Sequence, residues 1–223
     1  MKILITAGPT REYLDDVRYL SNASTGRMGY ALARAAAAAG HQVTLVHGPT
    51  CDAPPAAARR VAVTSALEMF DAVNREFSDC DAFIACAAVS DYRPRQRAAQ
   101  KMKREKIETL SLELVANPDI AAEMGRRKRP GQVLVCFALE TADGEANARA
   151  KLVRKNADAV VLNMAAAIGA EATEVTLFTA GSDTGETVRG SKDVAAQRIV
   201  ELCRDLWRRK NDVAPGGMAT GSP

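Results

Sequence analysis

The first loop of the chain carries residue types that are suited to binding an anion. An apolar, β-rich stretch at residues 2–7 leads into Gly8, and hydroxyl side chains at residues 24–25 come just before an Ala-rich stretch at residues 28–39. Hydroxyl and free backbone N–H groups at a helix start lie at the positive end of the helix dipole, which attracts phosphate or carboxylate. The loop matches neither the dinucleotide motif G-x-G-x-x-G nor a P-loop. A purely structural turn between strand and helix is therefore an equal alternative.

A second group of candidate residues follows the strand-like stretch at residues 81–86. Two alanines and then Asp91 suit a backbone that comes close to a ligand, while the carboxylate accepts hydrogen bonds or holds a cation. An ordinary turn acid is the alternative. In the basic stretch at residues 95–106, Lys101 and Lys103 would share one face of an extended chain and offer two ammonium groups to one anion. We expect a mobile cationic flap there, with a solvated charged loop as the alternative.

A third group lies in the second half of the chain. Asn117 and Pro118 precede the apolar spacing of residues 120–129, which predicts a helix with Asn117 as N-cap and Pro118 at the first helical position. Lys151 and Lys155 are four residues apart in a predicted helix and therefore share a face. Such a pair could hold a phosphate chain, and an ordinary surface stripe is the alternative.

Strand-like and helix-like stretches alternate along the chain. That order predicts a Rossmann-like, doubly wound α/β fold with a mainly parallel sheet, in which ligands collect at the carboxyl ends of the strands. An alternating stretch at residues 107–115 predicts a strand with one solvated face. Residues 173–179 and 186–189 predict a terminal hairpin. The other expected strands are residues 42–47, 60–63, 132–138 and 158–163, and the other expected helices are residues 65–77, 144–156 and 191–209.

Length and composition restrict the classes of protein that fit. A chain of 223 residues with 47% hydrophobic and 26% charged residues suits one large domain. We place it at residues 1–210 and expect a disordered tail at residues 211–223. A net charge of +3 and 4% aromatic residues argue against a nucleic-acid partner. Five cysteines without a C-x-x-C pair, two histidines, and no signal or membrane-spanning segment favour a reduced, cytoplasmic protein without a zinc site.

Several segments together resemble the phosphopantothenoylcysteine synthetase family, the ligases of coenzyme A biosynthesis. The match runs in order over nearly the whole chain, which makes it far more specific than any single glycine-rich loop. The matching segments are ITAGPTRE at residues 5–12, VRYLSNASTGRMG at 17–29, AAVSDYRP at 87–94, a K-x-K flap at 101–103, LELVANPDI at 112–120, FALET at 137–141 and KLVRKNAD at 151–158.

This resemblance implies the ligation of 4'-phosphopantothenate and L-cysteine. CTP and 4'-phosphopantothenate would form an acyl-cytidylate with loss of pyrophosphate, and the cysteine amine would then displace CMP. Mg²⁺ would accompany the nucleotide, with no flavin and no metal site made by the protein alone. A stand-alone homodimer is implied as well, with a small extra β lobe for dimerisation and a separate decarboxylase elsewhere. ATP stays open as the nucleotide, because the eukaryotic relatives use it.

The resemblance also assigns roles to individual positions. Asn22 corresponds to the family asparagine that handles the activated acyl intermediate, and Lys101 to the flap lysine, so both are expected to be catalytic. The phosphate and acyl loop is expected to contain Gly8, Ser24, Thr25 and Gly26. The residues expected to bind the nucleotide are Ala85, Cys86, Ala87, Asp91, Lys101, Pro118, Asp119, Ile120, Ala121, Phe137, Lys151 and Lys155.

Two other functions stay open on the sequence. A nucleotide-dependent oxidoreductase of Rossmann type would suit the fold, although the missing G-x-G-x-x-G motif weakens it. The basic stretches at residues 101–106 and 126–130 could contact nucleic acid, although cations in the last turn of a helix also favour the negative end of its dipole. The chain departs from the family in reading Ser-Thr-Gly-Arg at residues 24–27 instead of Ser-Ser-Gly-Lys, and Asn-Met at residues 163–164 instead of Asn-Asp.

Overall fold

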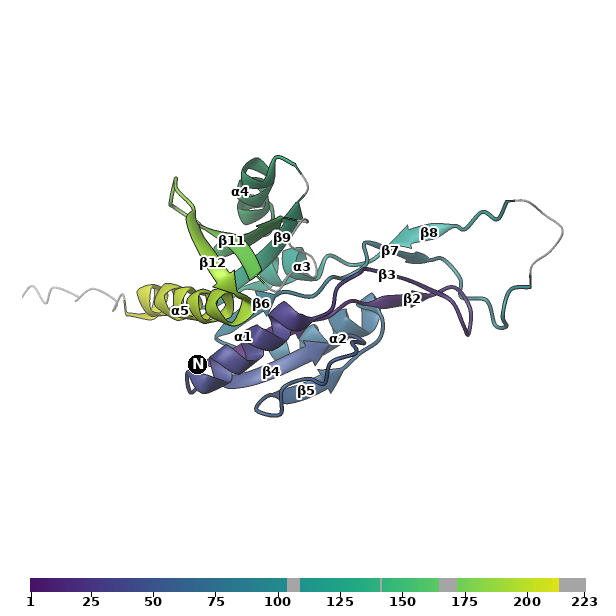
Figure 1. Cartoon of the computed structure of the whole chain (residues 1–223), viewed down its shortest axis with the longest axis horizontal. Coiled ribbons are helices and arrows are strands. Elements are labelled where there is room, and N and C mark those ends of the chain that lie inside the picture. Colours follow the sequence, from purple (N-terminus) through teal and green to yellow (C-terminus); the bar gives the residue numbers. More distant parts are fainter. Residues whose placement is uncertain (104–108, 141, 165–171, 213–223) are drawn as a thin grey trace, which may run out of the picture.

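An open sheet of eight strands runs through the body of the protein (Figure 1). The structure is a computed structural model, and it describes residues 1–103, 109–140, 142–164 and 172–212. The strand order is β12-β11-β10-β9-β6-β1-β4-β5. The strands from β10 to β5 pair in parallel, and β11 and β12 pair antiparallel at one edge. The strands are β1 (Lys2–Ala7), β4 (Gln42–His47), β5 (Arg59–Ala62), β6 (Ala82–Ala85), β9 (Val133–Glu140), β10 (Ala159–Met164), β11 (Ala172–Thr179) and β12 (Glu186–Ser191).

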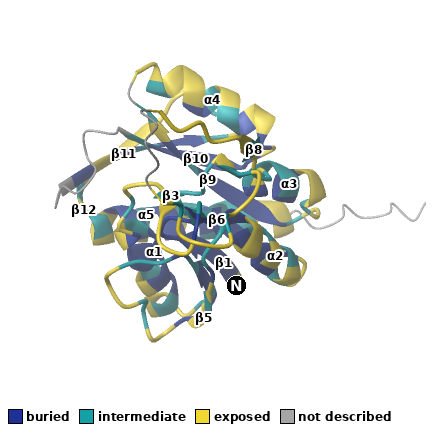
Figure 2. Ribbon diagram, turned by 90° about the vertical axis from the view of Figure 1, so that its right-hand side faces the viewer, coloured by how far each residue is buried: buried dark blue, intermediate teal, exposed yellow. Residues whose placement is uncertain are grey.

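Helices cover both faces of this sheet because its central strands are apolar on both sides. In β1, Ile3 and Ile5 belong to one core cluster and Leu4 to the other, and all three are buried. Figure 2 shows the buried residues along the sheet and on the inner sides of the helices. The predicted doubly wound, mainly parallel α/β fold is confirmed. The first face carries α1 (Arg27–Ala38) and α5 (Lys192–Asn211), and the second carries α2 (Ala66–Phe77), α3 (Ile120–Arg127) and α4 (Gly144–Arg154).

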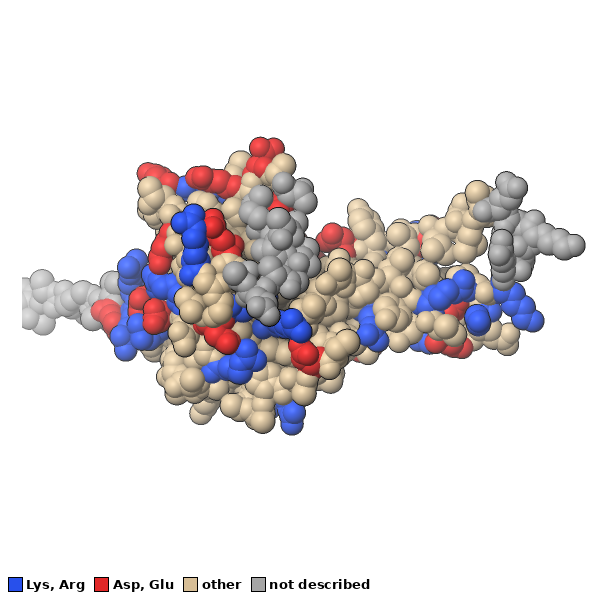
Figure 3. Space-filling model, in the orientation of Figure 1, with Lys and Arg blue, Asp and Glu red and all other residues tan. Residues whose placement is uncertain are grey.

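Two short ribbons project together from the sheet and form what we call the arm (Figure 1). The chain enters the arm from the carboxyl ends of β1 and β6, so the arm belongs to the edge where ligands are expected. Lys and Arg side chains gather on its outer part (Figure 3). The arm consists of β2 (Arg11–Tyr13) paired with β3 (Tyr19–Ser21), β7 (Tyr92–Pro94) paired with β8 (Leu114–Ala116), and the described residues between the strands of each pair.

The expected strand at residues 107–115 is wrong for most of its length. Within the described part of this stretch, strand structure begins only at Leu114, and residues 109–113 are not in a strand. The partner strand ends at Pro94. One backbone hydrogen bond follows, from the Arg95 N–H to the Glu113 carbonyl at 2.9 Å, but the strand does not continue past it. Alternation of apolar residues was therefore not enough to form a strand over residues 109–113, because the neighbouring strand β7 is too short to pair with them. The rest of that stretch, the end of the expected flap and the expected tail include residues outside the described ranges, namely 104–108 and 213–223.

The start of α3 also differs from the prediction. Asp119, and not Asn117, is the N-cap residue, because its side chain accepts a hydrogen bond from the Ala122 N–H at 3.0 Å. Asn117 instead donates from its side-chain amide to the Ser90 carbonyl at 2.8 Å. Pro118 therefore precedes the helix and does not open it. Both Asp and Asn cap helices well, so the contact between Asn117 and the loop after β6 decided between them.

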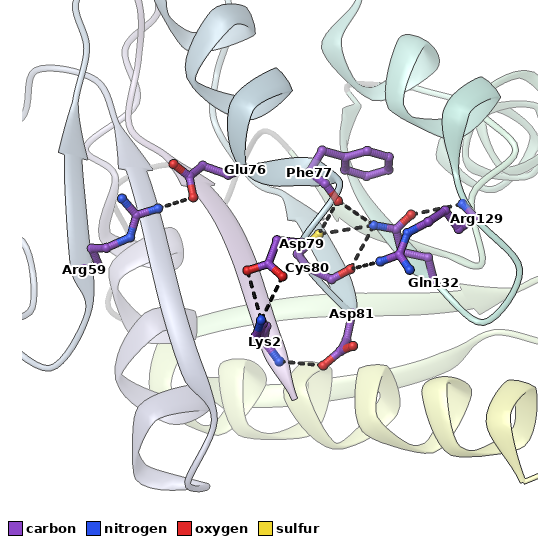
Figure 4. A network of polar contacts seen from close by, with 9 residues as sticks. All are labelled: Lys2, Arg59, Glu76, Phe77, Asp79, Cys80, Asp81, Arg129 and Gln132. Carbon is purple, nitrogen blue, oxygen red and sulfur yellow. Dashed lines mark hydrogen bonds and ion pairs between the residues drawn. The ribbon is translucent and has the colours of Figure 1, made fainter.

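Polar contacts fasten the opposite, amino-terminal edge of the sheet (Figure 4). The buried side-chain amide of Gln132 donates to the Phe77 carbonyl at 2.7 Å and to the Cys80 carbonyl at 2.9 Å. The Lys2 backbone N–H donates to the Asp81 carboxylate at 2.7 Å. These contacts hold β1, α2, β6 and β9 together at the edge away from the arm.

Candidate functional site

The loops after β1 and β6 lie side by side at the carboxyl edge of the sheet, and Ala88 is where they meet. Its N–H donates to the Gly8 carbonyl at 2.9 Å, and its own carbonyl accepts from the Thr10 N–H at 3.3 Å. The Thr10 hydroxyl in turn accepts the Ser90 N–H at 3.0 Å. The side-chain amide of Asn22 donates to the same Ala88 carbonyl at 3.0 Å. The two loops that the sequence offered as candidates are therefore joined by hydrogen bonds.

Gly8 and Gly26 allow the start of α1 to lie against the end of β1. Both have a φ of 75°, in the left-handed region that favours glycine. A Cβ on Gly26 would lie only 3.2 Å from the Gly8 Cα and 2.8 Å from Thr50 Cγ2. Gly26 is the N-cap residue of α1 and no side chain caps this helix, although the Gly26 N–H donates to Ser24 Oγ at 3.3 Å. The helix starts where expected, but the hydroxyl groups do not cap it.

A cavity of about 620 Å³ opens next to these loops, between the ends of β6 and β9, the start of α3 and one side of α4. Its walls combine apolar side chains with a few charged ones, as ligand pockets usually do. The structure thus brings together most of the residues predicted to bind a nucleotide. Those that line the cavity are Ala85, Ala87, Asp91, Pro118, Asp119, Ile120, Ala121, Phe137, Lys151 and Lys155.

One side of α4 presents three cations to the cavity. They are Lys151, Arg154 and Lys155, of which Lys151 donates to the Phe137 carbonyl at 2.9 Å. Arg154 is exposed, and no described residue forms a hydrogen bond or an ion pair with its guanidinium group. The N-terminus of α3, with Asp119 as its cap, faces the same space. A cationic wall beside a helix N-terminus suits a ligand with several negative charges.

Other predicted residues lie outside this cavity. Asn22 is exposed beside Ala88, and Lys101 is exposed on the arm. Cys86 packs against the core on the α1 and α5 side of the sheet, and burial raises the pKa of its thiol to about 12, which keeps the thiol protonated. The residues of the predicted phosphate and acyl loop also lie outside the cavity lining, namely Gly8, Ser24, Thr25 and Gly26.

Sequence reasoning missed several residues that line the cavity. Arg154 carried a usable signal, because it follows Lys151 by three positions and therefore shares its helix face. Cys136 lines the cavity too, and burial raises the pKa of its thiol to about 12, so it acts there as a small apolar group. The others were not assigned to the site. Six of them lie within the segments that match the family, namely Thr6, Val89, Ser90, Tyr92, Ala116 and Asn117, and the folded arrangement adds Phe83.

The described residues contain no group of three or more His, Cys, Asp or Glu side chains that could hold a metal ion. Asp91 and Asp119 are the carboxylates at the cavity, and Asp119 is already engaged by the N-terminus of α3. Among the helices that the structure describes, none combines the length and the apolar character needed to cross a bilayer.

The fold and this cavity define an open α/β protein with a cavity at the carboxyl edge of its sheet, to which α4 presents three cations. Residues 1–206 match the family model of the DNA/pantothenate metabolism flavoprotein C-terminal domain, and the chain belongs to this family. The family resemblance inferred from the sequence is confirmed.

Two curated relatives are both called coenzyme A biosynthesis bifunctional protein CoaBC. The chain is 42% identical over 209 residues to the protein of Vibrio parahaemolyticus, which covers 92% of this chain and 52% of the relative. It is 51% identical over 163 residues to the protein of Vibrio cholerae, which covers 73% of this chain and 41% of the relative. The chain thus spans about half, or less, of the length of these relatives.

Among solved structures, the chain is similar to the C-terminal domain of CoaBC. The TM-score is 0.77 at 36% identity, and the match covers 93% of this chain and 96% of that chain. A Cab2 variant in complex with phosphopantothenate-cysteine gives a TM-score of 0.77 at 18% identity, covering 95% and 89% of the two chains. At that identity the likeness concerns the fold alone.

Proposed function

We propose that the chain acts as a ligase of coenzyme A biosynthesis, which joins 4'-phosphopantothenate to L-cysteine through an acyl-nucleotidylate. The observation that carries the proposal is the cavity wall formed by Lys151, Arg154 and Lys155 beside the N-terminus of α3. A nucleoside triphosphate has the charge and the size to occupy such a cavity. The similarity to the C-terminal domain of a coenzyme A biosynthesis protein supports the same conclusion.

The proposed reaction has two steps. A carboxylate oxygen of 4'-phosphopantothenate attacks the α-phosphorus of CTP, and the bond to pyrophosphate breaks. The cysteine amine then attacks the acyl carbon, the bond to CMP breaks, and the amine proton leaves to solvent. Cations on the α4 wall would stabilise the charge that builds up on the leaving phosphates, an interaction that strengthens in the transition state.

Asn22 and Lys101 are the residues to which we assign catalytic roles. One N–H of the Asn22 amide donates to the Ala88 carbonyl. The amide has a second N–H, and we assign it to the acyl oxygen of the intermediate. Lys101 is exposed on the arm, and no described carboxylate pairs with it. Its ammonium group is therefore available to an anionic substrate at the carboxyl edge.

The residues at the cavity fit a metal ion that arrives with the nucleotide. Mg²⁺ usually binds through one or two carboxylates together with substrate phosphates and water. Asp91 suits this role, because no described residue forms a hydrogen bond with its carboxylate. When bound, Mg²⁺ would neutralise part of the triphosphate charge. CTP as the preferred nucleotide is likewise our proposal, and it rests on the family resemblance.

We also propose that the chain forms a homodimer through the arm. The arm exposes large apolar side chains, among them Val17 at 58%, Tyr92 at 57% and Leu110 at 60% of their surface. Exposed apolar side chains that cluster on one projecting unit are typical of a surface that binds another protein. A second copy of the chain would bury the same residues on both partners.

Pyrophosphate release tests the proposed activity most directly. Purified protein is given 4'-phosphopantothenate with CTP, with ATP or with no nucleotide, each with and without L-cysteine. We expect release that requires both 4'-phosphopantothenate and CTP, and amide product only when cysteine is present. Absence of release with either nucleotide would reject the ligase. In that case, binding of NADPH to the same protein would favour the oxidoreductase alternative.

A further inference from the structure

Asp15 is a buried carboxylate on the arm, in the turn between β2 and β3. Its side chain is 0% exposed. The Oδ1 atom accepts the backbone N–H groups of Val17 and Arg18, both at 2.8 Å, and these two bonds suffice to hold the turn. The Oδ2 atom has different partners, the guanidinium group of Arg18 and the backbone N–H of Met102 at 3.1 Å. One oxygen of this carboxylate, Oδ2, therefore binds Met102, a residue that is distant in the sequence.

Arg18 holds the other backbone group of Met102, its carbonyl. Its guanidinium group binds Asp15 Oδ2 and also donates to the Met102 carbonyl at 2.6 Å. The carboxylate thus takes the N–H of Met102 and the guanidinium takes its C=O, so both backbone groups of one residue are fixed. Two further contacts run alongside, the Ala98 N–H to the Leu14 carbonyl at 2.8 Å and an ion pair between Arg97 and Asp16.

Met102 stands between the two lysines of the K-x-K segment. Consecutive Cα atoms lie about 3.8 Å apart, so a fixed Met102 backbone also fixes where the Lys101 side chain starts. The Lys101 and Lys103 side chains themselves are exposed. The arrangement therefore sets the position of the backbone and leaves the ammonium groups free to reach a ligand.

We propose that Asp15 and Arg18 form a positioning pair, which holds the Met102 backbone so that Lys101 starts from the place where it stabilises the leaving pyrophosphate. The inference rests on the proposed function, because it needs Lys101 to act in the reaction. It links the first loop of the chain, which carries Asn22, to the flap that carries Lys101.

The charges of the pair fit this role. Burial by itself would raise the pKa of Asp15, but hydrogen bonds from the Arg18 side chain and from the N–H groups of Val17, Arg18 and Met102 bring it well below its ordinary value. The carboxylate stays ionised near neutral pH, and its hydrogen bonds are of the stronger, charge-assisted kind. A charged pair in a fixed geometry restricts a peptide more than a neutral turn would.

The first experiment measures whether the positioning pair holds the Met102 backbone, and it does not depend on activity. In Asp15→Asn, the remaining carbonyl oxygen can still accept the turn N–H groups, but the acceptor for the Met102 N–H and for Arg18 is lost. Asp16→Asn is the matched control, since it removes the neighbouring exposed ion pair to Arg97 and leaves Met102 untouched. Hydrogen exchange should show faster exchange at Met102 in Asp15→Asn and unchanged exchange in Asp16→Asn. Equal exchange in both variants would overturn the proposal.

The second experiment asks whether the positioning pair affects the reaction rate through Lys101. A misplacement of about 1 Å can cost on the order of a hundredfold in rate, and we expect Asp15→Asn to lower kcat for pyrophosphate release about tenfold with little change in KM for CTP. Arg18→Lys, which keeps the charge and loses the bond to the Met102 carbonyl, should lose less. In a Lys101→Ala background, Asp15→Asn should cause no further loss of kcat.

These outcomes separate the inference from the function on which it rests. A full additional loss of kcat in the Lys101→Ala background would mean that Asp15 is merely structural, and would overturn the positioning role. Thermal unfolding of each variant shows that it is folded at the assay temperature. If the wild-type protein itself releases no pyrophosphate, the proposed function fails, and the positioning role fails with it whatever the hydrogen exchange shows.

Discussion

Lys155, at the C-terminal end of α4, forms an ion pair with Asp119, the N-cap residue of α3. The lysine side chain is 9% exposed and the aspartate side chain 53%. Burial lowers the pKa of Lys155 below its ordinary value, and the negative charge of nearby Asp91 acts in the opposite direction. Both residues line the cavity. A phosphate group that enters the cavity would therefore compete with Asp119 for this ammonium group.

This pair leads to two predictions of opposite sign. Lys155→Met should weaken the binding of CTP by about tenfold, since a charge-assisted hydrogen bond to phosphate is lost. Asp119→Asn should tighten it a few fold, because asparagine still caps α3 while the competing charge disappears. Isothermal titration calorimetry measures both. Arg126→Gln, which removes an exposed pair to Glu123 on the same helix as Asp119, is the control. Weaker binding in Asp119→Asn would show that the carboxylate assists the nucleotide.

The two flap lysines should differ in their effect on rate. Lys101→Ala should slow pyrophosphate release by about a hundredfold or more, as does the loss of other preorganised electrostatic groups. Lys103→Ala should cost much less. Single-turnover measurement of pyrophosphate release with saturating CTP gives both rates. Small and equal losses would identify the basic stretch as a solvated loop.

Asn22→Asp should separate the two half-reactions. The change keeps the shape but places an acceptor and a negative charge against an acyl oxygen whose own charge rises as cysteine attacks. An interaction made mainly in the transition state is worth about 3 kcal/mol, or on the order of a hundredfold in rate. The variant should therefore still release some pyrophosphate while it forms little amide.

Quench-flow with mass spectrometry follows acyl-cytidylate and amide in wild type and in Asn22→Asp. The amide step should be the slower one in the variant. Normal conversion of the intermediate to amide would show that Asn22 only supports the loop through its bond to the Ala88 carbonyl.

The association state of the protein is predicted to depend on the arm. Light scattering at micromolar concentration should give the mass of a dimer of the 23.8 kDa chain. Tyr92→Lys combined with Leu110→Lys places charges on the exposed apolar surface and should shift the equilibrium to monomer. Val153→Lys, on the outer side of α4 with 84% exposure, is the control. A monomeric wild-type protein would contradict the prediction.

Asp15 should contribute a stability that disappears in acid. The pKa of Asp15 is lower in the folded protein than its ordinary value of 3.8. At a pH between the folded pKa and 3.8, Asp15 is therefore protonated in more of the unfolded chains than of the folded ones. The contribution is then complete above pH 3.8 and is lost as the pH falls toward the folded pKa. The Tm difference between wild type and Asp15→Asn, measured by circular dichroism, should shrink in that range. A difference independent of pH would mean that the carboxylate charge plays no part.

The sequence by itself determined the order and type of the sheet elements. Strands such as Lys2–Ala7 and Gln42–His47 are short stretches rich in apolar and β-branched residues, and that composition is a local property of the sequence. The N-cap of α2 is likewise a local feature, because Ser65 accepts from the Glu68 N–H within its own turn at 3.2 Å. Likewise the ordered segments predicted the family, since they depend only on residue types and spacing.

Only the tertiary structure decided which residues that are distant in the sequence contact each other at the site and on the arm. Asn117 and Asp119 are both good helix caps, and the choice depended on Ser90, far away in the chain. The stretch at residues 107–115 alternates like a strand, but β7 ends at Pro94, and beyond that pair the bond from the Arg95 N–H to the Glu113 carbonyl does not extend the strand. The contacts of Asp15 with Met102 span 87 positions. Such contacts depend on which elements the fold places next to each other, and no local periodicity carries that information.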